Sequence, residues 1–440
     1  MLKKIAGVAV AALMVAGGPA MAEKQFEGVS LRVLANQDAW SDSLKAMADQ
    51  FTEETGATVQ FDQFAFGQAV QKITVELTTK SSAYDLVFVS GSDVSQYSPG
   101  GFLEPLSSHL ANRDIVATDP NLADFIPATL RLFQGEDGEQ YALPNFAATQ
   151  IMFYNAEKLA EAGFEKPPET WQELYDYCSK LGGDGDPCTA MRGKPSVSEN
   201  MWYFSQMMYG YGARFFADYP NDMTPTVNSE GAVQALELYG KLLNDFGIPG
   251  SVSAGFDEVT VAMQQDNVDL VVEGAPLAGR ILDPELSKVI GKLGFALPPA
   301  GPEGRFAPFA AQGYAVNAAS KNKEAAVAFL AWSTSSEVMK QVTLDSSFLA
   351  VTRSSVWNDA DYRAKHDYNF GHGSFSEAYE GTLQAGVEWY RLPFPEFNAI
   401  ADRVGLAVQE HVVGSKSAQE ALDDAQKDIT TILKRAGRLE

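Results

Sequence analysis

The chain has 440 residues, of which 45% are apolar and 20% are charged, so it is long enough to bury two or three cores. Its 57 acidic residues against 33 basic ones give a formal net charge of −24. A protein with this charge repels nucleic acid and anionic membrane surfaces, so neither is expected as a partner.

The first 22 residues have the pattern of a secretory signal peptide. Lys3 and Lys4 form a basic start, residues 5–18 are an apolar run, and Ala20-Met21-Ala22 fits a small-residue cleavage site. The apolar run is shorter than the roughly 20 residues that a membrane span needs. The sequence therefore predicts export to the periplasm, with residues 1–22 removed. Removing Lys3 and Lys4 takes the net charge from −24 to −26.

Strand-like and helix-like segments alternate in the first part of the exported chain. Strands are expected over residues 29–35, 57–64 and 85–89, with helices over 44–51 and 69–79 between them. Gly56 is the expected end of the first helix. Strands that alternate with helices in this way predict a parallel α/β sheet.

The same alternation returns in the second part. Strands are expected over residues 150–154, 268–272, 293–297 and 314–317, with a helix over 231–246. Three further helices have predicted N-caps at Thr170, Asn322 and Ser417, the last of which forms a capping box with Glu420. A chain of this length and pattern suits two α/β lobes better than one.

The two cysteines of the chain lie in the exported part. Cys178 and Cys188 flank a segment rich in Gly and Asp. In an oxidising compartment this spacing predicts a local disulfide, which would contribute roughly 2–3 kcal/mol by restricting the unfolded chain. Two cysteines without nearby histidines do not make a four-ligand zinc site.

Motifs of catalysis are absent from the sequence. It contains no nucleophile elbow, no phosphate-binding loop and no dinucleotide-binding glycine pattern. His366 and His372 are close in sequence, but exposed loop histidines explain them better than a metal site. We therefore expect no enzyme activity, no metal and no cofactor. A secreted carbohydrate-active enzyme stays open as a remote alternative, since only the distance between carboxylates decides that case.

Aromatic and polar residues follow the predicted strands, where α/β sheets expose their ligand sites. Planar polar side chains can bind the hydroxyl groups of a sugar, and aromatic rings can stack on its apolar face. The candidates of this kind are Trp40, Gln68, Ser92, Asp93, Trp202, Tyr203 and Trp389.

The ordered set of motifs along the chain resembles one bacterial family. These motifs are Tyr84-Asp-Leu-Val-Phe88, Gly101-Phe-Leu-Glu-Pro-Leu106, Tyr141-Ala-Leu-Pro144, Phe153-Tyr-Asn-Ala-Glu-Lys-Leu159, Pro167-Pro-Glu-Thr-Trp171, the segment 313–326 and Gln419-Glu-Ala-Leu-Asp-Asp-Ala-Gln426. Together they are similar to the extracellular solute-binding proteins of carbohydrate ABC importers, the family that includes maltose-binding protein. The resemblance covers nearly the whole exported chain.

The resemblance implies a type II periplasmic-binding-protein fold, with two α/β lobes joined by a hinge that the chain crosses several times. It places the first lobe at residues 23–146 plus 312–350, and the second at 147–311 plus 351–440. The crossings are expected near 145–149, 306–312 and 348–352. The ligand-facing positions that it implies are Trp40, Ser92, Asp93, Asn145, Glu273, Gly274, Gln312, Gly313 and the region of Trp389.

The function that the resemblance implies is capture of a small sugar or polyol between the lobes by a monomer. Closure of the lobes on the ligand would then be recognised by the permease subunits of an importer.

Ala275-Pro276 stands where the family often has a Trp, which argues against a long oligosaccharide. Two rival hypotheses keep the fold. In one, Arg353, with Arg391 as a second candidate, clamps a sugar phosphate or another acidic sugar; in the other, the protein reports its ligand to a sensor.

Overall fold

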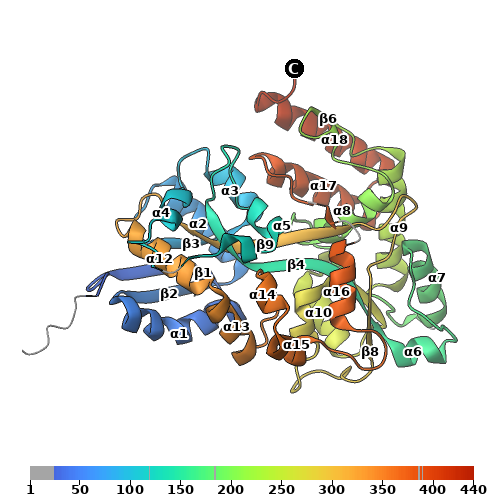
Figure 1. The fold of residues 1–440 in the computed structure, drawn as a ribbon. Coiled ribbons are helices and arrows are strands. Elements are labelled where there is room, and N and C mark those ends of the chain that lie inside the picture. The colour runs from blue at the N-terminus through green and yellow to red at the C-terminus, as the bar shows by residue number, and fades with distance from the viewer. Residues whose placement is uncertain (1–23, 118, 183–184, 385–386, 389) are drawn as a thin grey trace, which may run out of the picture.

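The computed structural model describes residues 24–440 apart from 118, 183–184, 385–386 and 389, so the predicted signal peptide lies outside the described residues. One sheet runs through the molecule, with the strand order β2-β1-β3-β9-β4-β7; β8 pairs with β4, and β10 pairs with β9. Helices cover this sheet at both ends, which gives two lobes (Figure 1).

The first lobe is built on the predicted parallel strands, which lie at β1 (Ser30–Asn36), β2 (Thr58–Phe64) and β3 (Leu86–Ser90). β1 pairs in parallel with both neighbours, as the alternation predicted. Helix α1 (Ala39–Thr55) ends at Gly56, whose φ of 86° is the left-handed conformation that glycine adopts readily. The other helices of this lobe are α2 (Phe66–Thr78), α3 (Gly91–Tyr97), α4 (Ser107–Ala111), α5 (Pro127–Arg131), α12 (Lys323–Ser333), α13 (Ser336–Asp345), α14 (Ser354–Trp357) and α15 (Ala360–His366).

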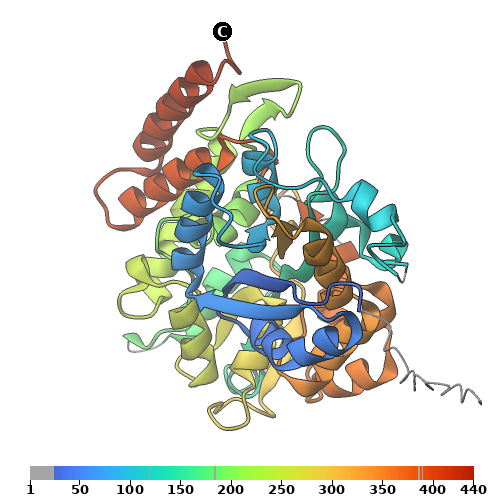
Figure 2. The ribbon, with the colours of Figure 1, turned by 90° about the vertical axis from the view of Figure 1, so that its left-hand side faces the viewer.

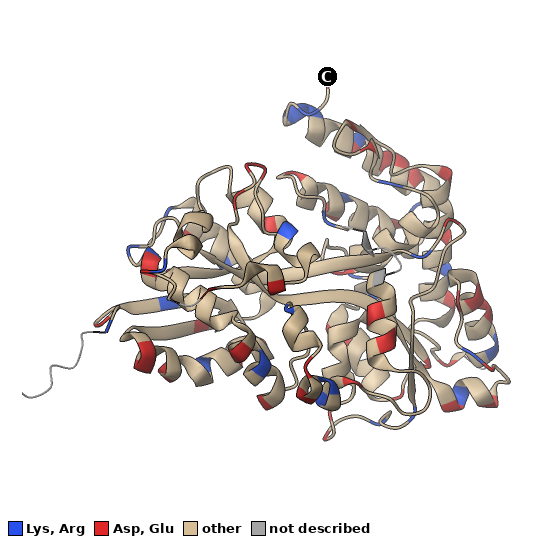
Figure 3. Ribbon diagram, viewed as in Figure 1, with Lys and Arg blue, Asp and Glu red and all other residues tan. Residues whose placement is uncertain are grey.

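Two long strands carry the chain between the lobes. β4 (Ala142–Asn155) pairs antiparallel with β9 (Ala307–Val316), and β9 also pairs antiparallel with β3. The predictions of strands at 150–154 and 314–317 found only the far ends of these two elements. Neither strand contains a charged residue, and their middle parts have Ala, Gly and Pro in place of the alternating pattern that identifies a strand (Figure 3).

The second lobe surrounds the other end of β4. Its strands are β5 (Phe216–Asp218), β6 (Asp222–Pro225), β7 (Leu270–Gly274), β8 (Leu293–Ala296) and β10 (Val387–Glu388). Its helices are α6 (Ala156–Glu161), α7 (Trp171–Leu181), α8 (Asn200–Gly210), α9 (Glu230–Phe246), α10 (Phe256–Gln264), α11 (Ala278–Ile281), α16 (Phe375–Gln384), α17 (Phe397–Val412) and α18 (Ala418–Arg435). Figure 2 shows α17, α18 and the β5–β6 hairpin together at one edge, away from β1 and β2.

Three hydrophobic cores support this arrangement. One core lies in the first lobe, and two lie on opposite faces of the sheet in the second lobe. Val351, Val356 and Tyr362 belong to the core of the first lobe. The predicted lobe boundary at residue 350 stays a prediction, and from this packing we propose that the first lobe continues to the end of α15 at His366.

Several local predictions have clear outcomes. The disulfide is confirmed, since Cys178 and Cys188 are bonded with their Cα atoms 5.3 Å apart. Thr170 and Ser417 cap α7 and α18 as predicted, and the capping box with Glu420 is present. Asn322 precedes α12 without a side-chain capping hydrogen bond, and its Nδ2 donates to Asp85 Oδ1 at 3.2 Å.

His366 is not the exposed loop residue that we expected. It ends α15 and is 1% exposed, with Nε2 bonded to the Thr343 carbonyl oxygen at 2.8 Å. Packing of α15 on α13 removes it from solvent, and the sequence showed no periodicity there. Within the described ranges, no helix combines the length and apolar character that crossing a bilayer requires.

Candidate functional site

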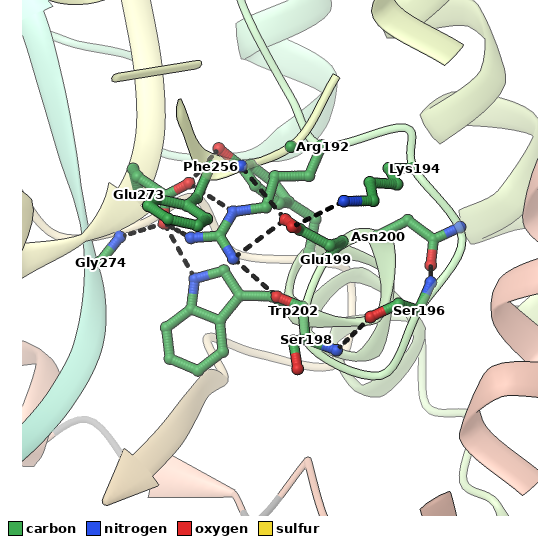
Figure 4. Close-up of polar contacts among 12 residues, drawn as sticks. Arg192, Lys194, Ser196, Ser198, Glu199, Asn200, Trp202, Phe256, Glu273 and Gly274 are labelled. Carbon is green, nitrogen blue, oxygen red and sulfur yellow. Dashed lines mark hydrogen bonds and ion pairs between the residues drawn. The ribbon is translucent and has the colours of Figure 1, made fainter. Parts of the chain in front are cut away.

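A buried ion pair at the end of β7 organises the second-lobe side of the candidate site (Figure 4). Arg192 Nε donates to Glu273 Oε2 at 2.8 Å, and Nη2 donates to Oε1 at 2.6 Å. Glu273 is 0% exposed and Arg192 is 9% exposed. Burial lowers the pKa of Arg192, but the Glu273 carboxylate raises it above its ordinary value, so the guanidinium stays charged.

The same carboxylate orients two aromatic side chains of α8. Trp202 Nε1 donates to Glu273 Oε1 at 3.1 Å, and Tyr203 OH donates to Oε2 at 3.3 Å. The backbone N–H of Gly274 donates to Oε1 as well. With two donors from Arg192, five donors surround this carboxylate, which is more than the roughly four lone-pair sites of its two oxygens. Glu273 therefore positions its neighbours, and the ligand contact that the resemblance implied for it stays a prediction.

Two further charged residues complete this cluster. Glu199 Oε2 lies 3.6 Å from Arg192 Nη1, and Lys194 Nζ lies 3.8 Å from Glu199 Oε1. Burial raises the pKa of Glu199, while the charges of Arg192 and Lys194 act in the opposite direction. The two basic and two acidic residues of the cluster thus balance in charge.

On the first lobe, Ser92 and Asp93 lie where β3 ends and α3 begins. Asp93 Oδ2 accepts the backbone N–H of Ser90 at 2.8 Å, as part of a capping box. Burial raises the pKa of Asp93, whereas the Ser90 hydrogen bond and the charge of Arg391 lower it. The N-cap Ser90 is thereby held at the edge of the sheet, directly beside Ser92 and Asp93.

Arg391 joins the two sides. Its Nη2 donates to Ser198 Oγ at 2.7 Å, beside the Arg192 cluster, and its Nη1 donates to Ser92 Oγ at 3.4 Å on the first lobe. The guanidinium carbon also lies 5.1 Å from the centroid of the Tyr390 ring. Arg391 Nε is buried, and no described residue accepts a hydrogen bond from it.

The third side consists of the crossing strands β4 and β9. Gln312 pairs with Ser90 and Phe146, so it lies between β3 and β4. Gly313 is required by a close approach, because a Cβ there would lie 2.3 Å from the Leu143 carbonyl oxygen. Asn145 is 2% exposed, and its Oδ1 has no hydrogen-bond partner among the described residues.

Trp40 begins α1 at the same edge of the sheet. Its ring is fully buried, with its centroid 5.1 Å from that of Phe348. Within the described part of the chain, neither Trp40 Nε1 nor Oδ1 of Asn36, the last residue of β1, has a partner. Because β1 and β3 are parallel, their carboxyl ends bring Trp40 and Ser92 to one edge.

Comparison with known families agrees with this structure of two lobes, crossing strands and a polar edge. A model of the family described as bacterial extracellular solute-binding protein matches residues 36–340, which is more than half of the chain. The chain belongs to this family.

Individual relatives extend the similarity over most of this solute-binding protein. A mannitol-binding protein of Pseudomonas aeruginosa is 27% identical over 380 residues, which are 83% of this chain and 84% of the relative. An ABC transporter solute-binding protein of Agrobacterium radiobacter, solved with ribitol, has a TM-score of 0.82 and 25% identity, and the match covers 92% of this chain and 99% of the other. A solute-binding protein of Agrobacterium vitis, solved with D-mannitol, has a TM-score of 0.80 at 24% identity over 93% and 99% of the two chains, and so supports the fold.

Three predicted residues lie apart from this site or outside the described residues. Gln68 is exposed on the first turn of α2. Arg353 is 2% exposed within the first lobe; its Nη2 donates to the Pro120 carbonyl oxygen at 2.9 Å, and its Nη1 contacts Asp124 Oδ2 at 3.3 Å. Trp389 lies outside the described residues, so its role stays a prediction. The ligand contacts of the other ten also remain predictions.

Sequence reasoning missed Arg192, Ser198 and Gln206 of this solute-binding protein. One signal could have revealed Arg192, because a Glu at the end of an apolar strand requires a buried counter-charge. Gln206 follows Trp202 by one helical turn and is 1% exposed, and its amide atoms lack partners among the described residues. No sequence pattern identifies Ser198 or Gln206, because only the fold brings them to the site.

Proposed function

We propose that this solute-binding protein is the periplasmic component of an ABC importer and binds a small neutral polyol or sugar between its lobes. In this proposal residues 1–22 are the signal for export, and the ligand is released chemically unchanged. Permease subunits of the importer are the expected partners of the monomer.

The observation that carries the proposal is a set of buried polar atoms that have no partner among the described residues and that lie on α1, on β4 and in the segment before α17. Trp40 Nε1 and Arg391 Nε are donors, whereas Asn145 Oδ1 is an acceptor. Buried groups of this kind are costly unless something hydrogen-bonds to them. A molecule with several hydroxyl groups supplies donors and acceptors at once, so a polyol fits this set better than an apolar ligand.

The charges of the site favour a neutral ligand. Arg192 and Lys194 are balanced by Glu199 and Glu273, and Arg391 is balanced by Asp93. The rival hypothesis of an anion held by Arg353 loses its support, because all three nitrogens of that guanidinium donate to groups of the first lobe. Its ring partner Phe125, 3.9 Å away, covers one face of the guanidinium as well.

The relatives point to the same class of ligand. The proteins named above bind mannitol or were solved with ribitol and D-mannitol, which are acyclic polyols. Family members of known name are binding proteins, which supports binding without catalysis in this chain. A ligand that contacts both lobes would favour their closed arrangement, since it binds that arrangement more tightly than the open one.

A thermal-shift and calorimetry panel tests the proposal. The exported chain is titrated with pentitols, hexitols, monosaccharides, sugar acids, sugar phosphates and amino acids. We expect one neutral polyol or sugar class to raise the melting temperature and to bind with a ratio of one. A shift with only an amino acid or a sugar phosphate would contradict the proposed ligand, and conversion of the recovered polyol would contradict the absence of catalysis.

A further inference from the structure

We infer that Arg391 and Asp93 form a charge pair across the two lobes that makes the site selective for uncharged ligands. This inference rests on the proposed function and deepens it, because it assigns the discrimination between a polyol and the corresponding sugar acid to two residues.

The geometry brings Arg391 into contact with the residue that precedes Asp93. Arg391 comes from the segment between α16 and α17 of the second lobe, and Nη1 reaches Ser92 Oγ at 3.4 Å. Ser92 is the neighbour of Asp93 in the first turn of α3. Arg391 Nη2 is held by Ser198 Oγ at 2.7 Å, so the guanidinium cannot turn away from Ser92 without losing this bond.

Both charged side chains can form further hydrogen bonds with a ligand. The two bonds of Arg391 go to neutral hydroxyl groups, and its buried Nε has no partner among the described residues. Asp93 accepts the backbone N–H of Ser90 at Oδ2 and has the Ser90 side chain as a second partner, which are two of the roughly four hydrogen bonds that a carboxylate can accept. A ligand with vicinal hydroxyls can accept from the guanidinium and donate to the carboxylate, and it leaves the pair neutral.

For an anionic ligand, attraction to one charge of the pair is opposed by repulsion from the other. A carboxylate in place of a terminal hydroxymethyl group would gain attraction to Arg391 but suffer repulsion from Asp93, and it would lose its own hydration. Without Asp93, the same guanidinium would instead be an anion-binding group. Asp93 therefore acts as the residue that excludes acids, and Arg391 as the residue that binds hydroxyls.

The test compares two ligands that differ in one terminal group, D-glucitol and D-gluconate, by calorimetry on the wild-type protein and three variants. Asp93→Asn should lower the ratio of glucitol affinity to gluconate affinity by about tenfold or more. Arg391→Gln should raise that ratio, since it leaves Asp93 without its counter-charge. Asp424→Asn on α18 is the matched control, because it removes the same charge as Asp93→Asn from an ion pair outside this site, and it should leave the ratio unchanged.

The two charge changes must act in opposite directions, which a general loss of structure cannot produce. If Asp93→Asn does not fold, the direction of the Arg391→Gln effect still decides. Equal ratios in the wild type and the Arg391→Gln variant would overturn the inference while the proposed function stands. A wild type that binds neither glucitol, mannitol, ribitol nor any sugar would overturn both.

Discussion

At the scale of single residues, the site depends on charges that the protein has buried in pairs. Arg192 and Glu273 are buried, and Trp202 and Tyr203 take their orientation from the Glu273 carboxylate. Removing one partner of such a pair leaves an uncompensated charge, which costs about 3–5 kcal/mol. Replacing both partners with apolar residues avoids that cost but removes the acceptor of the two aromatic side chains.

A double-mutant cycle separates these two effects. Arg192→Met and Glu273→Leu should each lower the free energy of unfolding by about 3–5 kcal/mol, and the double variant should recover most of this loss. Polyol affinity should be low in the two variants that lack Glu273, because Trp202 and Tyr203 have lost their acceptor there. Urea unfolding and calorimetry measure the two quantities. A double variant that binds the polyol as the wild type does would contradict an orienting role for Glu273.

Part of the site was predictable at this scale. Ser92 and Asp93 were found because they follow a predicted strand, Trp202 because it belongs to an aromatic cluster, and Glu273 through the family resemblance; all four lie at the candidate site. Their contacts within the protein were not predictable. Only the distances show that Arg192 and the α8 side chains donate to the oxygens of Glu273.

At the scale of elements, local signals decided where helices begin. Ser417 caps α18 through its side chain and forms the predicted box with Glu420. Ser229 precedes α9, a helix of nearly the same length, but its side chain makes no capping bond. The sequence separates these two serines, because Glu420 stands three residues after Ser417, whereas Ala232 stands three residues after Ser229.

The two serines form a matched pair for measurement. Ser417→Ala should lower the free energy of unfolding by about 1 kcal/mol, since it leaves backbone N–H groups of α18 without an acceptor. Ser229→Ala should change it by much less, because no capping bond is lost. Thermal unfolding of both variants checks this expectation. A larger loss of stability for Ser229→Ala than for Ser417→Ala would contradict it.

At the scale of the whole molecule, the two lobes share one sheet through β4 and β9. The fold class was predictable, because the order of strands and helices and the family motifs extend over the whole chain. The shared strands were not, since their middle parts, such as residues 144–149 and 307–311, have small and apolar residues without alternation. Pairing with distant partners, rather than local propensity, makes these segments strands.

Gly313 lies where three strands of the sheet come closest. A Cβ at this position would lie 2.3 Å from the Leu143 carbonyl oxygen, so Gly313→Ala must push β9 away from β4. We expect a loss of about 1–3 kcal/mol in the free energy of unfolding. Gly274→Ala is the control, because the nearest atom to its Cβ would be Trp202 Cζ2 at 3.9 Å. Equal stability of the two variants in chemical denaturation would contradict a tight crossing.

The position of β9 has a consequence for how the protein is made. This strand lies between β3 and β4 in the sheet, but it follows them by more than 150 residues in the chain. A growing polypeptide that has emerged only as far as β8 therefore has a gap in the centre of its first lobe, with the edges of β3 and β4 unpaired. The lobe closes only when residues 307–316 arrive, so its central pairing cannot form before most of the chain has been made.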